Sequence, residues 1–327
     1  MIPPLALTMG DPAGISGEIT IKAWRSGAVR APFFCIDDPE RLRALGAEVT
    51  VIASAAEATA AQGLPVLPEH LPAAITMGTP TAANAAAVIR SIDRAVSLTQ
   101  AGEASAVVTN PINKKALYDG ADFTHPGHTE YLAHLTGAAR SVMMLAAPGL
   151  RVVPVTIHIP LSAVPEQLTT ALIVQTGTIL SEALARDFGL DRPRIAVAGL
   201  NPHAGEGGAM GTEDMSIVAP AIKQLHARGI DAFGPLPADT MFHESARAKY
   251  DAALCMYHDQ ALIPVKMLDF AKGVNVTLGL PIIRTSPDHG VAYDIAGTGA
   301  ADPSSLIEAL NVAAEMAERR AARADLA

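Results

Sequence analysis

Leu200-Asn201-Pro202-His203-Ala204-Gly205-Glu206-Gly207-Gly208-Ala209-Met210-Gly211-Thr212-Glu213-Asp214 is the stretch that decides how this sequence folds. The apolar, strand-like run 195–200 leads into it, and a helical pattern over residues 213–228 follows. A buried strand, a glycine-rich loop and a helix in succession are typical of an α/β fold. His203 stands beyond the strand, where such sheets commonly present ligand-binding side chains.

Two further apolar runs also end in a histidine. Residues 152–157 lead to His158, and residues 252–257 lead to His258. Because ligands bind beyond the carboxyl ends of strands in open α/β sheets, three imidazoles that converge there would form a metal site of the open, catalytic type. A strand-end histidine can instead be a capping or core residue, and spacing alone does not distinguish the two readings.

Composition excludes several classes of protein. A chain of 327 residues is long enough for two domains. No apolar run approaches the length of a membrane span, and the N-terminus lacks the pattern of a signal peptide. The net charge of −9 argues against a nucleic-acid-binding surface, and the two cysteines, Cys35 and Cys255, lie in apolar runs rather than in a disulfide framework. We therefore expect a cytoplasmic protein that binds neither membrane nor nucleic acid.

Short apolar runs alternate with alanine-rich helical segments along the chain. The predicted strands include residues 5–9, 33–36, 49–52 and 104–109, and the predicted helices include 81–101, 166–188 and 303–323. This alternation predicts mostly parallel sheets covered by helices.

Other polar segments admit two readings. The turn at residues 10–18 could bring backbone amides to an anion, or it could be structural, since it matches neither the dinucleotide fingerprint nor a Walker loop. Lys114 and Lys115 could bind a ligand or begin a solvated helix. His128 and Thr129 beside a helix start suit an anionic ligand, whereas simple capping by Thr129 is the alternative.

At this point the motifs resemble a known family. The segments that carry the resemblance are 8–14, 127–130, 201–214, 237–240, 257–260 and 273–299. Together they are similar to the 4-hydroxythreonine-4-phosphate dehydrogenase family of pyridoxal phosphate biosynthesis, and the likeness covers nearly the whole chain. Residues 289–299 also resemble the cofactor-binding loop of isopropylmalate dehydrogenases.

The resemblance implies a two-domain α/β/α fold with mostly parallel sheets, similar to isopropylmalate dehydrogenases, with the active site in the cleft between the domains. Residues 1–130 plus 285–327 would form the first domain, which carries the cofactor loop. Residues 131–284 would form the second, which carries the metal histidines and the dimer interface.

The resemblance also assigns roles to particular residues. The metal ligands it implies are His158, His203 and His258. The substrate-binding residues are His128, Thr129, Lys266, Asn275 and Arg284, and the catalytic residues are Asp239 and Lys266. The cofactor-binding residues are Asp288, His289, Gly290, Asp294, Gly297 and Gly299.

The implied reaction is an NAD-dependent oxidation of a secondary alcohol in a small anionic substrate, followed by loss of carbon dioxide. A divalent metal (zinc, cobalt or magnesium) would act as a Lewis acid at the alcohol oxygen, and each site would draw on both subunits of a homodimer. NAD is favoured over NADP because residues 288–299 contain no lysine or arginine to bind a 2′-phosphate.

The native substrate stays open at this stage. Asn110 and the pair His125-Pro126 depart from the usual pattern near the expected substrate. The alternatives are a related dehydrogenase of threonate or erythronate 4-phosphate, or of an aromatic dicarboxylate cis-dihydrodiol. A phosphate acyltransferase is a further alternative, although such an enzyme needs neither the three histidines nor the 289–299 loop.

Overall fold

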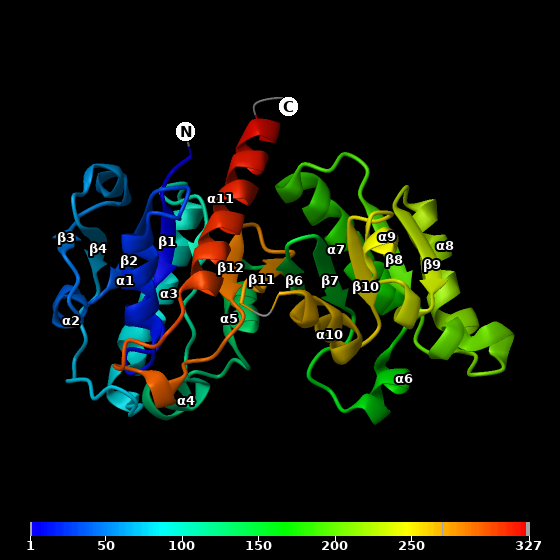
Figure 1. The fold of residues 1–327 in the computed structure, drawn as a ribbon, viewed down its shortest axis with the longest axis horizontal. Helices are drawn as coiled ribbons and strands as arrows, with labels where there is room; N and C mark the ends of the chain where they lie inside the picture. The colour runs from blue at the N-terminus through cyan, green and yellow to red at the C-terminus, as the bar shows by residue number, and fades with distance from the viewer. Residues whose placement is uncertain (1, 270, 325–327) are drawn as a thin grey trace. The chain divides into compact units, whose positions relative to one another are not determined.

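The computed structural model describes residues 2–269 and 271–324, which form two α/β units whose elements are labelled in Figure 1. Unit 1 consists of Met1–Ser141 with Leu280–Asp325, and unit 2 of Val142–Gly279. The predicted boundaries, after residues 130 and 284, differ because the helix at His128–Thr136 packs within unit 1 and the chain returns to unit 1 before Arg284.

The sheet of unit 1 is parallel throughout. Its strands are β1 (Leu5–Thr8), β2 (Phe33–Asp37), β3 (Val49–Val51), β4 (Leu64–Pro68), β5 (Val107–Val108) and β12 (Arg284–Pro287). Their order across the sheet is β3-β4-β2-β1-β5-β12. β1 and β2 are buried along their whole length, as expected when helices cover both faces of a parallel sheet.

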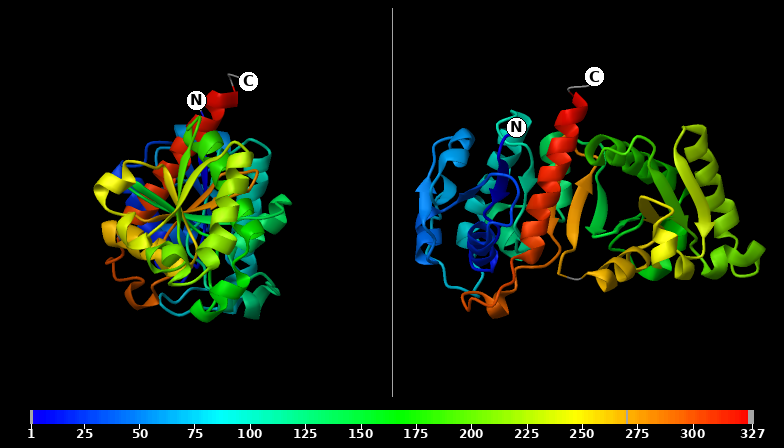
Figure 2. Two further views of the ribbon diagram at one scale, coloured as in Figure 1. Left: turned by 90° about the vertical axis from the view of Figure 1, so that its right-hand side faces the viewer. Right: turned by 45° about the horizontal axis from the view of Figure 1, so that its top comes forward.

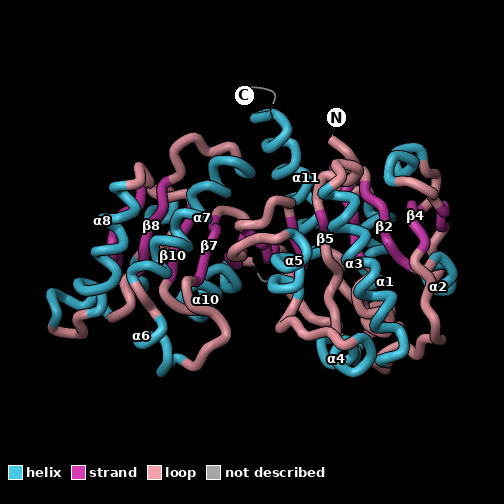
Figure 3. Tube along the Cα trace, turned by 180° about the vertical axis from the view of Figure 1, so that it is seen from behind, coloured by secondary structure: helices cyan, strands magenta, loops and turns pink. Residues whose placement is uncertain are grey.

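Helices cover this sheet on both sides. They are α1 (Ser16–Ser26), α2 (Pro39–Ala44), α3 (Ala85–Gln100), α4 (Lys114–Ala121), α5 (His128–Thr136) and α11 (Ser304–Ala324), with short 3₁₀ turns η1 (Ala55–Ala60), η2 (Ala82–Asn84) and η7 (Tyr293–Ile295). α3 packs on β1 and α5, as seen from behind in Figure 3, and α11 runs along β12 (Figure 2). The helix expected from residue 81 starts at Ala85, because Thr81 caps the preceding 3₁₀ turn instead.

The sheet of unit 2 is mixed. Its strands are β6 (Val142–Ala147), β7 (Leu150–Pro154), β8 (Arg194–Ala198), β9 (Asp231–Leu236), β10 (Ala252–Cys255) and β11 (Val274–Leu278), in the order β11-β6-β7-β10-β8-β9. β7, β10, β8 and β9 pair in parallel, whereas β6 pairs antiparallel with both β7 and β11. Gly149, with φ +79°, makes the tight turn of the β6–β7 hairpin.

The helices of unit 2 are α6 (Val164–Gln167), α7 (Thr170–Phe188), α8 (Ala219–Ala227), α9 (Glu244–Arg247) and α10 (His258–Leu268), with short turns η3 (Leu161–Ala163), η4 (Pro202–Gly208), the π-turn η5 (Asp214–Val218) and η6 (Ala238–Thr240). The helix predicted at 166–188 is two helices, because the Thr169 side chain caps the second at Leu172 N–H. Among the described residues no single helix is long and apolar enough to span a membrane. One pair, Leu161–Gln167 with Thr170–Phe188, meets that test jointly across a 93° bend.

Candidate active site

The three strands that precede the candidate histidines are neighbours in unit 2. β10 lies between β7 and β8 and pairs in parallel with both. Their carboxyl ends therefore lie at one edge of the sheet, which is the arrangement that the sequence pattern predicts. His258 begins α10 directly beyond β10, whereas His158 and His203 stand on loops beyond β7 and β8.

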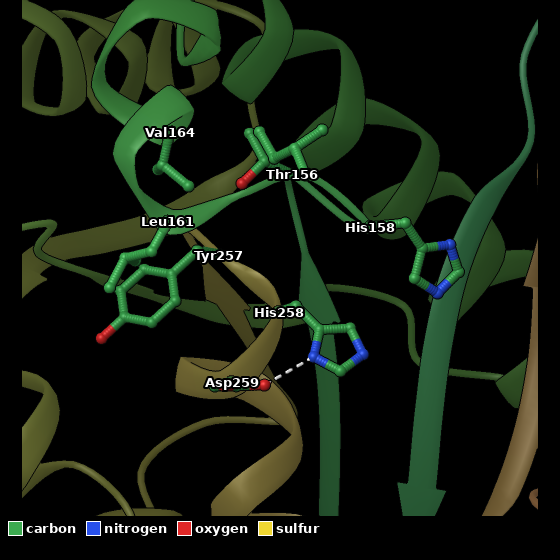
Figure 4. A pocket seen from close by; sticks show the side chains of 8 residues that line it. Thr156, His158, Leu161, Val164, Tyr257, His258 and Asp259 are labelled. Carbon is green, nitrogen blue, oxygen red and sulfur yellow. Dashed lines mark hydrogen bonds and ion pairs between the residues drawn. The ribbon is translucent and has the colours of Figure 1, made fainter.

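His158 and His258 lie beside one pocket of about 300 Å³. Their ring centroids are 5.8 Å apart, and Figure 4 shows both imidazoles on one side of the pocket with Leu161 and Val164 on the other. His258 Nδ1 is 2.7 Å from a carboxylate oxygen of Asp259. A carboxylate in that position holds the proton on Nδ1 and leaves Nε2 as the donor atom for a metal, which is the usual outer-shell arrangement of a metal histidine.

His203 stands on an unusual backbone. His203 and Ala204 both have φ +52°, Glu206 has φ +40°, and Gly205 and Gly207 between and after them are also positive. His158 has φ +52° as well. Left-handed conformations cost side-chain-bearing residues roughly 1–2 kcal/mol each and concentrate at functional sites. Both loop histidines are thus held in strained positions at the edge of the sheet.

Within a single chain, the structure brings only part of the expected metal set together. His203 is exposed and does not line the pocket shared by His158 and His258. Among residues 2–269 and 271–324, no three His, Cys, Asp or Glu side chains are grouped so that they could hold a metal ion.

The other site residues predicted in unit 2 lie on neighbouring elements. Asp239 is exposed on η6, which contacts η4, the turn that carries His203. Lys266 is half-buried two turns along α10 from His258. Asn275 lies in β11, and its side-chain oxygen is buried with no hydrogen-bond partner among residues 2–269 and 271–324. A buried acceptor left unpaired is costly, so Asn275 is suited to a ligand that supplies a donor.

In unit 1, the buried Arg284 lies close enough to His128 to act on its imidazole. Arg284 begins β12, is 4% exposed and donates a 2.6 Å hydrogen bond to the Thr109 hydroxyl. Burial lowers its pKa to about 10, so it remains a cation at neutral pH. Burial, Arg284 and Lys114 together hold the pKa of His128 well below its usual range, so its imidazole is neutral at neutral pH. Its Nε2 is buried, and none of the described residues forms a hydrogen bond with it. These groups suit an anion.

Lys114 is a residue of this site that the sequence left undecided. It begins α4, capped by Asn113, and a side chain at Gly127 would come within 3.4 Å of its ammonium nitrogen. Glycine at 127 therefore leaves room for Lys114 beside His128. The adjacent Lys115 instead makes a 2.6 Å ion pair with Asp119. The polar loop that follows β5 is the sequence feature that could have pointed to Lys114. Only the folded structure shows that the two adjacent lysines have different roles.

The predicted cofactor loop, residues 288–299, is anchored on the first turn and helix of the chain. The Tyr293 hydroxyl donates to Asp11 at 2.6 Å, and Ile15 N–H donates to the Val291 carbonyl at 3.0 Å. Lys22 on α1 donates to the Gly299 carbonyl at 2.7 Å. The turn at residues 10–18 thus supports the loop, a role that the sequence interpretation did not include.

The exposed part of that loop has the groups that a dinucleotide requires. Asp294, Gly290 and Gly299 are exposed, and the His289 Nε2 atom is buried with no partner in the described part of the chain. An accessible carboxylate can accept hydrogen bonds from ribose hydroxyls, and glycines permit close approach of a ligand to the backbone. The residues present are therefore compatible with the cofactor expected from the sequence.

The fold and these groups define a class first: an α/β protein with a histidine-bearing strand edge, a buried arginine beside an imidazole, and a glycine-rich loop anchored on the first helix. Comparison with known proteins specifies it further. Residues 30–313 match the family model of the pyridoxal phosphate biosynthetic protein PdxA. The chain is 56% identical, over 97% of its length and 98% of the relative's, to the 4-hydroxythreonine-4-phosphate dehydrogenase of Paracoccus denitrificans (strain Pd 1222).

Solved structures agree with this match. The 4-hydroxythreonine-4-phosphate dehydrogenase of Klebsiella pneumoniae superposes with a TM-score of 0.90 at 41% identity, covering 97% of this chain and 98% of that one. A terephthalate 1,2-cis-dihydrodiol dehydrogenase from Burkholderia xenovorans LB400 gives 0.68 at 28% identity, covering 96% and 98%. The chain belongs to the PdxA family. It is an oxidoreductase of the dehydrogenase type that acts on a CH–OH group, and the predicted family and α/β fold class are confirmed.

Proposed function

We propose that this enzyme oxidises 4-phosphooxy-L-threonine (4-hydroxythreonine 4-phosphate) to its 3-oxo acid with NAD, and that the 3-oxo acid decarboxylates to 3-amino-2-oxopropyl phosphate. Relatives named for this activity share more than half of their residues with the chain over almost its whole length, which supports the substrate. The rings of His158 and His258 lie beside one another, and Asp259 contacts His258 Nδ1. This arrangement is the observation that best supports metal-dependent oxidation.

The metal and the cofactor would each supply one part of the reaction. A divalent metal (zinc, cobalt or magnesium) held by His158, His203 and His258 would act as a Lewis acid toward the substrate hydroxyl. NAD, rather than NADP, would lie on Asp288, His289, Gly290, Asp294, Gly297 and Gly299 and would accept the hydride. The three imidazoles suit such a metal, and the exposed Asp294 carboxylate suits the cofactor.

The protein's own side chains would bind and orient the substrate. Arg284, His128 and Thr129 of unit 1 suit an anionic group, because a buried cation and an unpaired imidazole nitrogen lie together there. In unit 2, Asn275 offers an unpaired carbonyl oxygen to a substrate donor.

Asp239 and Lys266 are proposed to move protons. The Asp239 carboxylate would accept the proton from the alcohol oxygen while the carbon that bears this oxygen loses a hydride. The new ketone is β to the carboxylate, so the carbon–carbon bond to that carboxylate breaks and releases carbon dioxide. The Lys266 ammonium would then supply a proton to the resulting enolate carbon.

A homodimer with shared sites is part of the proposal. Large apolar side chains are exposed close in sequence to each of the three histidines: Leu161 near His158, Met210 and Met215 beyond His203, and Ile263 and Met267 on the helix that His258 begins. Met267 is 75% exposed and Leu161 is 68% exposed. Exposed apolar side chains close to the proposed ligands support an interface at this edge of unit 2. A second copy of the chain would cover these side chains and complete the metal set.

A substrate panel tests the proposal. NAD reduction would be measured with 4-phosphooxy-L-threonine, threonate 4-phosphate, erythronate 4-phosphate and a terephthalate cis-dihydrodiol, with and without added divalent metal. We expect the highest kcat/KM for 4-phosphooxy-L-threonine. Preference for the dihydrodiol, the substrate class in the name of the 28%-identical relative, would replace the proposed substrate. Acyl transfer to phosphate without NAD reduction would reject a dehydrogenase altogether.

The cofactor assignment predicts the behaviour of Asp294→Ala. Loss of a charged hydrogen-bond acceptor costs about 1.5–3 kcal/mol, so the KM for NAD should rise roughly 10- to 100-fold while the KM for substrate changes little. Steady-state kinetics in both substrates give the two constants. Glu103→Ala, which removes another exposed carboxylate of unit 1, is the control and should leave both unchanged. A larger effect on the substrate KM would move this loop to the substrate side.

Shared sites predict that inactive variants rescue one another. His203→Ala and Arg284→Met chains would be mixed after denaturation, and the experiment repeated with His158→Ala and His258→Ala. When the two altered residues belong to different subunits at each site, a mixed dimer retains one intact site of two and should recover up to about half of the wild-type turnover. No recovery in any pairing, with mixed dimers verified by differential tagging, would mean that each site is built within one chain.

A further inference from the structure

The loop that carries His203 is held by two buried polar side chains that the mechanism above does not use. His203 lies in a run of six consecutive positive φ angles, from His203 to Gly208. A chain segment in that conformation persists only where its surroundings over-determine it. Neighbouring groups must therefore hold this turn in place at the edge of the sheet.

Asp214 is the first of the two holding residues. It begins η5 and is 1% exposed. Its carboxylate accepts hydrogen bonds from Leu200 N–H at 2.7 Å, from Asn201 N–H at 3.1 Å and from the Asn201 side-chain amide at 3.0 Å. One buried carboxylate thus fixes both ends of the loop, because residue 214 closes it and residues 200 and 201 open it.

The loop is packed tightly against this carboxylate. A Cβ atom at Gly199 would lie 3.0 Å from one Asp214 oxygen, and a Cβ at Gly205 would lie 3.3 Å from the other and 2.8 Å from the Gly211 carbonyl. Gly205 also has φ +79°. Both glycines therefore allow close approach to Asp214, which explains why glycine stands at the end of the strand-like run and again inside the loop.

Gln260 is the second holding residue, and it connects two of the histidine-bearing segments. It is 8% exposed and lies two positions after His258 on α10. Its amide nitrogen donates to the Gly199 carbonyl at 2.7 Å, and its carbonyl oxygen accepts from Met256 N–H at 2.7 Å. Gln260 thus ties the joint between β10 and α10, where His258 stands, to the start of the His203 loop.

We infer that Asp214 and Gln260 are positioning residues for the metal ligands: they set the backbone that presents His203 and His258 at the edge of unit 2. The inference rests on the metal-dependent function proposed above. Both residues act through hydrogen bonds to backbone groups beside the ligands, and neither is itself a ligand. Outer residues that orient metal ligands typically contribute 10- to 100-fold to metal affinity.

Three isosteric changes test the two side chains separately. Asp214→Asn keeps the volume but turns an NH₂ group toward the loop donors. Gln260→Glu keeps the acceptor for Met256 N–H but sets a carboxylate oxygen against the Gly199 carbonyl. Gln260→Met keeps the length without either hydrogen bond, and it is the variant to measure if a charged or mispaired one does not fold. Asp187→Asn alters another buried carboxylate of the same unit, one that pairs with the more exposed Arg186 on α7, and serves as the matched control.

The readout is Co²⁺ binding by the full-length protein, followed by its visible absorption without substrate or NAD. We expect wild type and Asp187→Asn to bind alike, and the Asp214 and Gln260 variants to bind 10- to 100-fold more weakly with shifted absorption bands, at unchanged NAD affinity. Wild-type Co²⁺ affinity and spectrum in the folded variants would overturn the inference, as would an equal loss in Asp187→Asn. Absence of Co²⁺ binding by wild type would instead overturn the proposed metal dependence.

Discussion

On the proposed function, replacing His203 by alanine should abolish binding of the divalent metal and lower turnover by roughly three orders of magnitude. Lewis-acid stabilisation of a developing alkoxide is worth several kcal/mol, and each 1.36 kcal/mol is a factor of ten in rate. The fold should persist, because His203 is exposed on its loop and contributes little to the core. Its left-handed backbone is moreover held by neighbouring groups, not by the imidazole.

Metal content after dialysis, turnover and thermal unfolding measure the three expectations separately. His243→Ala removes another exposed histidine of unit 2, one that contacts Ser245, and should leave all three unchanged. A His203→Ala protein that keeps its full metal content and normal turnover would show that this histidine is a structural loop residue. The same measurements on His158→Ala and His258→Ala would then identify the ligands.

Arg284→Met should reduce kcat/KM for the phosphorylated substrate by roughly 10²- to 10⁴-fold. Arg284 is 4% exposed, and a buried anion that loses its cationic partner costs about 3–5 kcal/mol. A substrate analogue without phosphate should lose far less, because it leaves no buried negative charge uncompensated. The comparison of the two substrates therefore isolates the charge from any general disturbance of the site.

Arg43→Met is the control for this prediction, since Arg43 is a partly exposed cation of the same unit paired with Glu40. It should leave both substrates unaffected. Equal losses for the phosphorylated and neutral substrates in Arg284→Met would indicate that Arg284 supports β12 and Thr109 structurally and does not bind the anion.

Much of the fold was predictable because local patterns determine elements. The buried strands β1, β2, β8 and β10 are continuous apolar runs, and a run of that kind has few alternatives to a parallel strand covered on both faces. β6 was not predicted, because its two methionines and two alanines carry no period-two pattern and its antiparallel partners are β7 and β11. This segment forms a strand because it pairs with β7 and β11 in the folded protein.

The candidate site residues stay predictions from the sequence, whereas the contacts that hold them in place could not be predicted. Asp11 meets Tyr293 across 282 positions of sequence, and Gln260 meets Gly199 across 61. Such contacts depend on how strands are ordered in a sheet, and no local pattern reports that order. Lys114 and Lys115 are adjacent in sequence, and no local pattern distinguishes their roles. In the folded protein Lys114 lowers the pKa of His128, whereas Lys115 forms an ion pair with Asp119.

By itself, then, the sequence determined the α/β class, the histidines that follow three strands, the glycine-rich loops and the family. Each of these depends on a contiguous run of side chains that has its own physical preference. Only the tertiary structure decided that β10 lies between β7 and β8, that Arg284 belongs to unit 1 with His128, and that His203 sits on a left-handed turn held by Asp214 and Gln260. These features arise from hydrogen bonds and burial between distant segments, whose free energy exists only once the chain has brought those segments together.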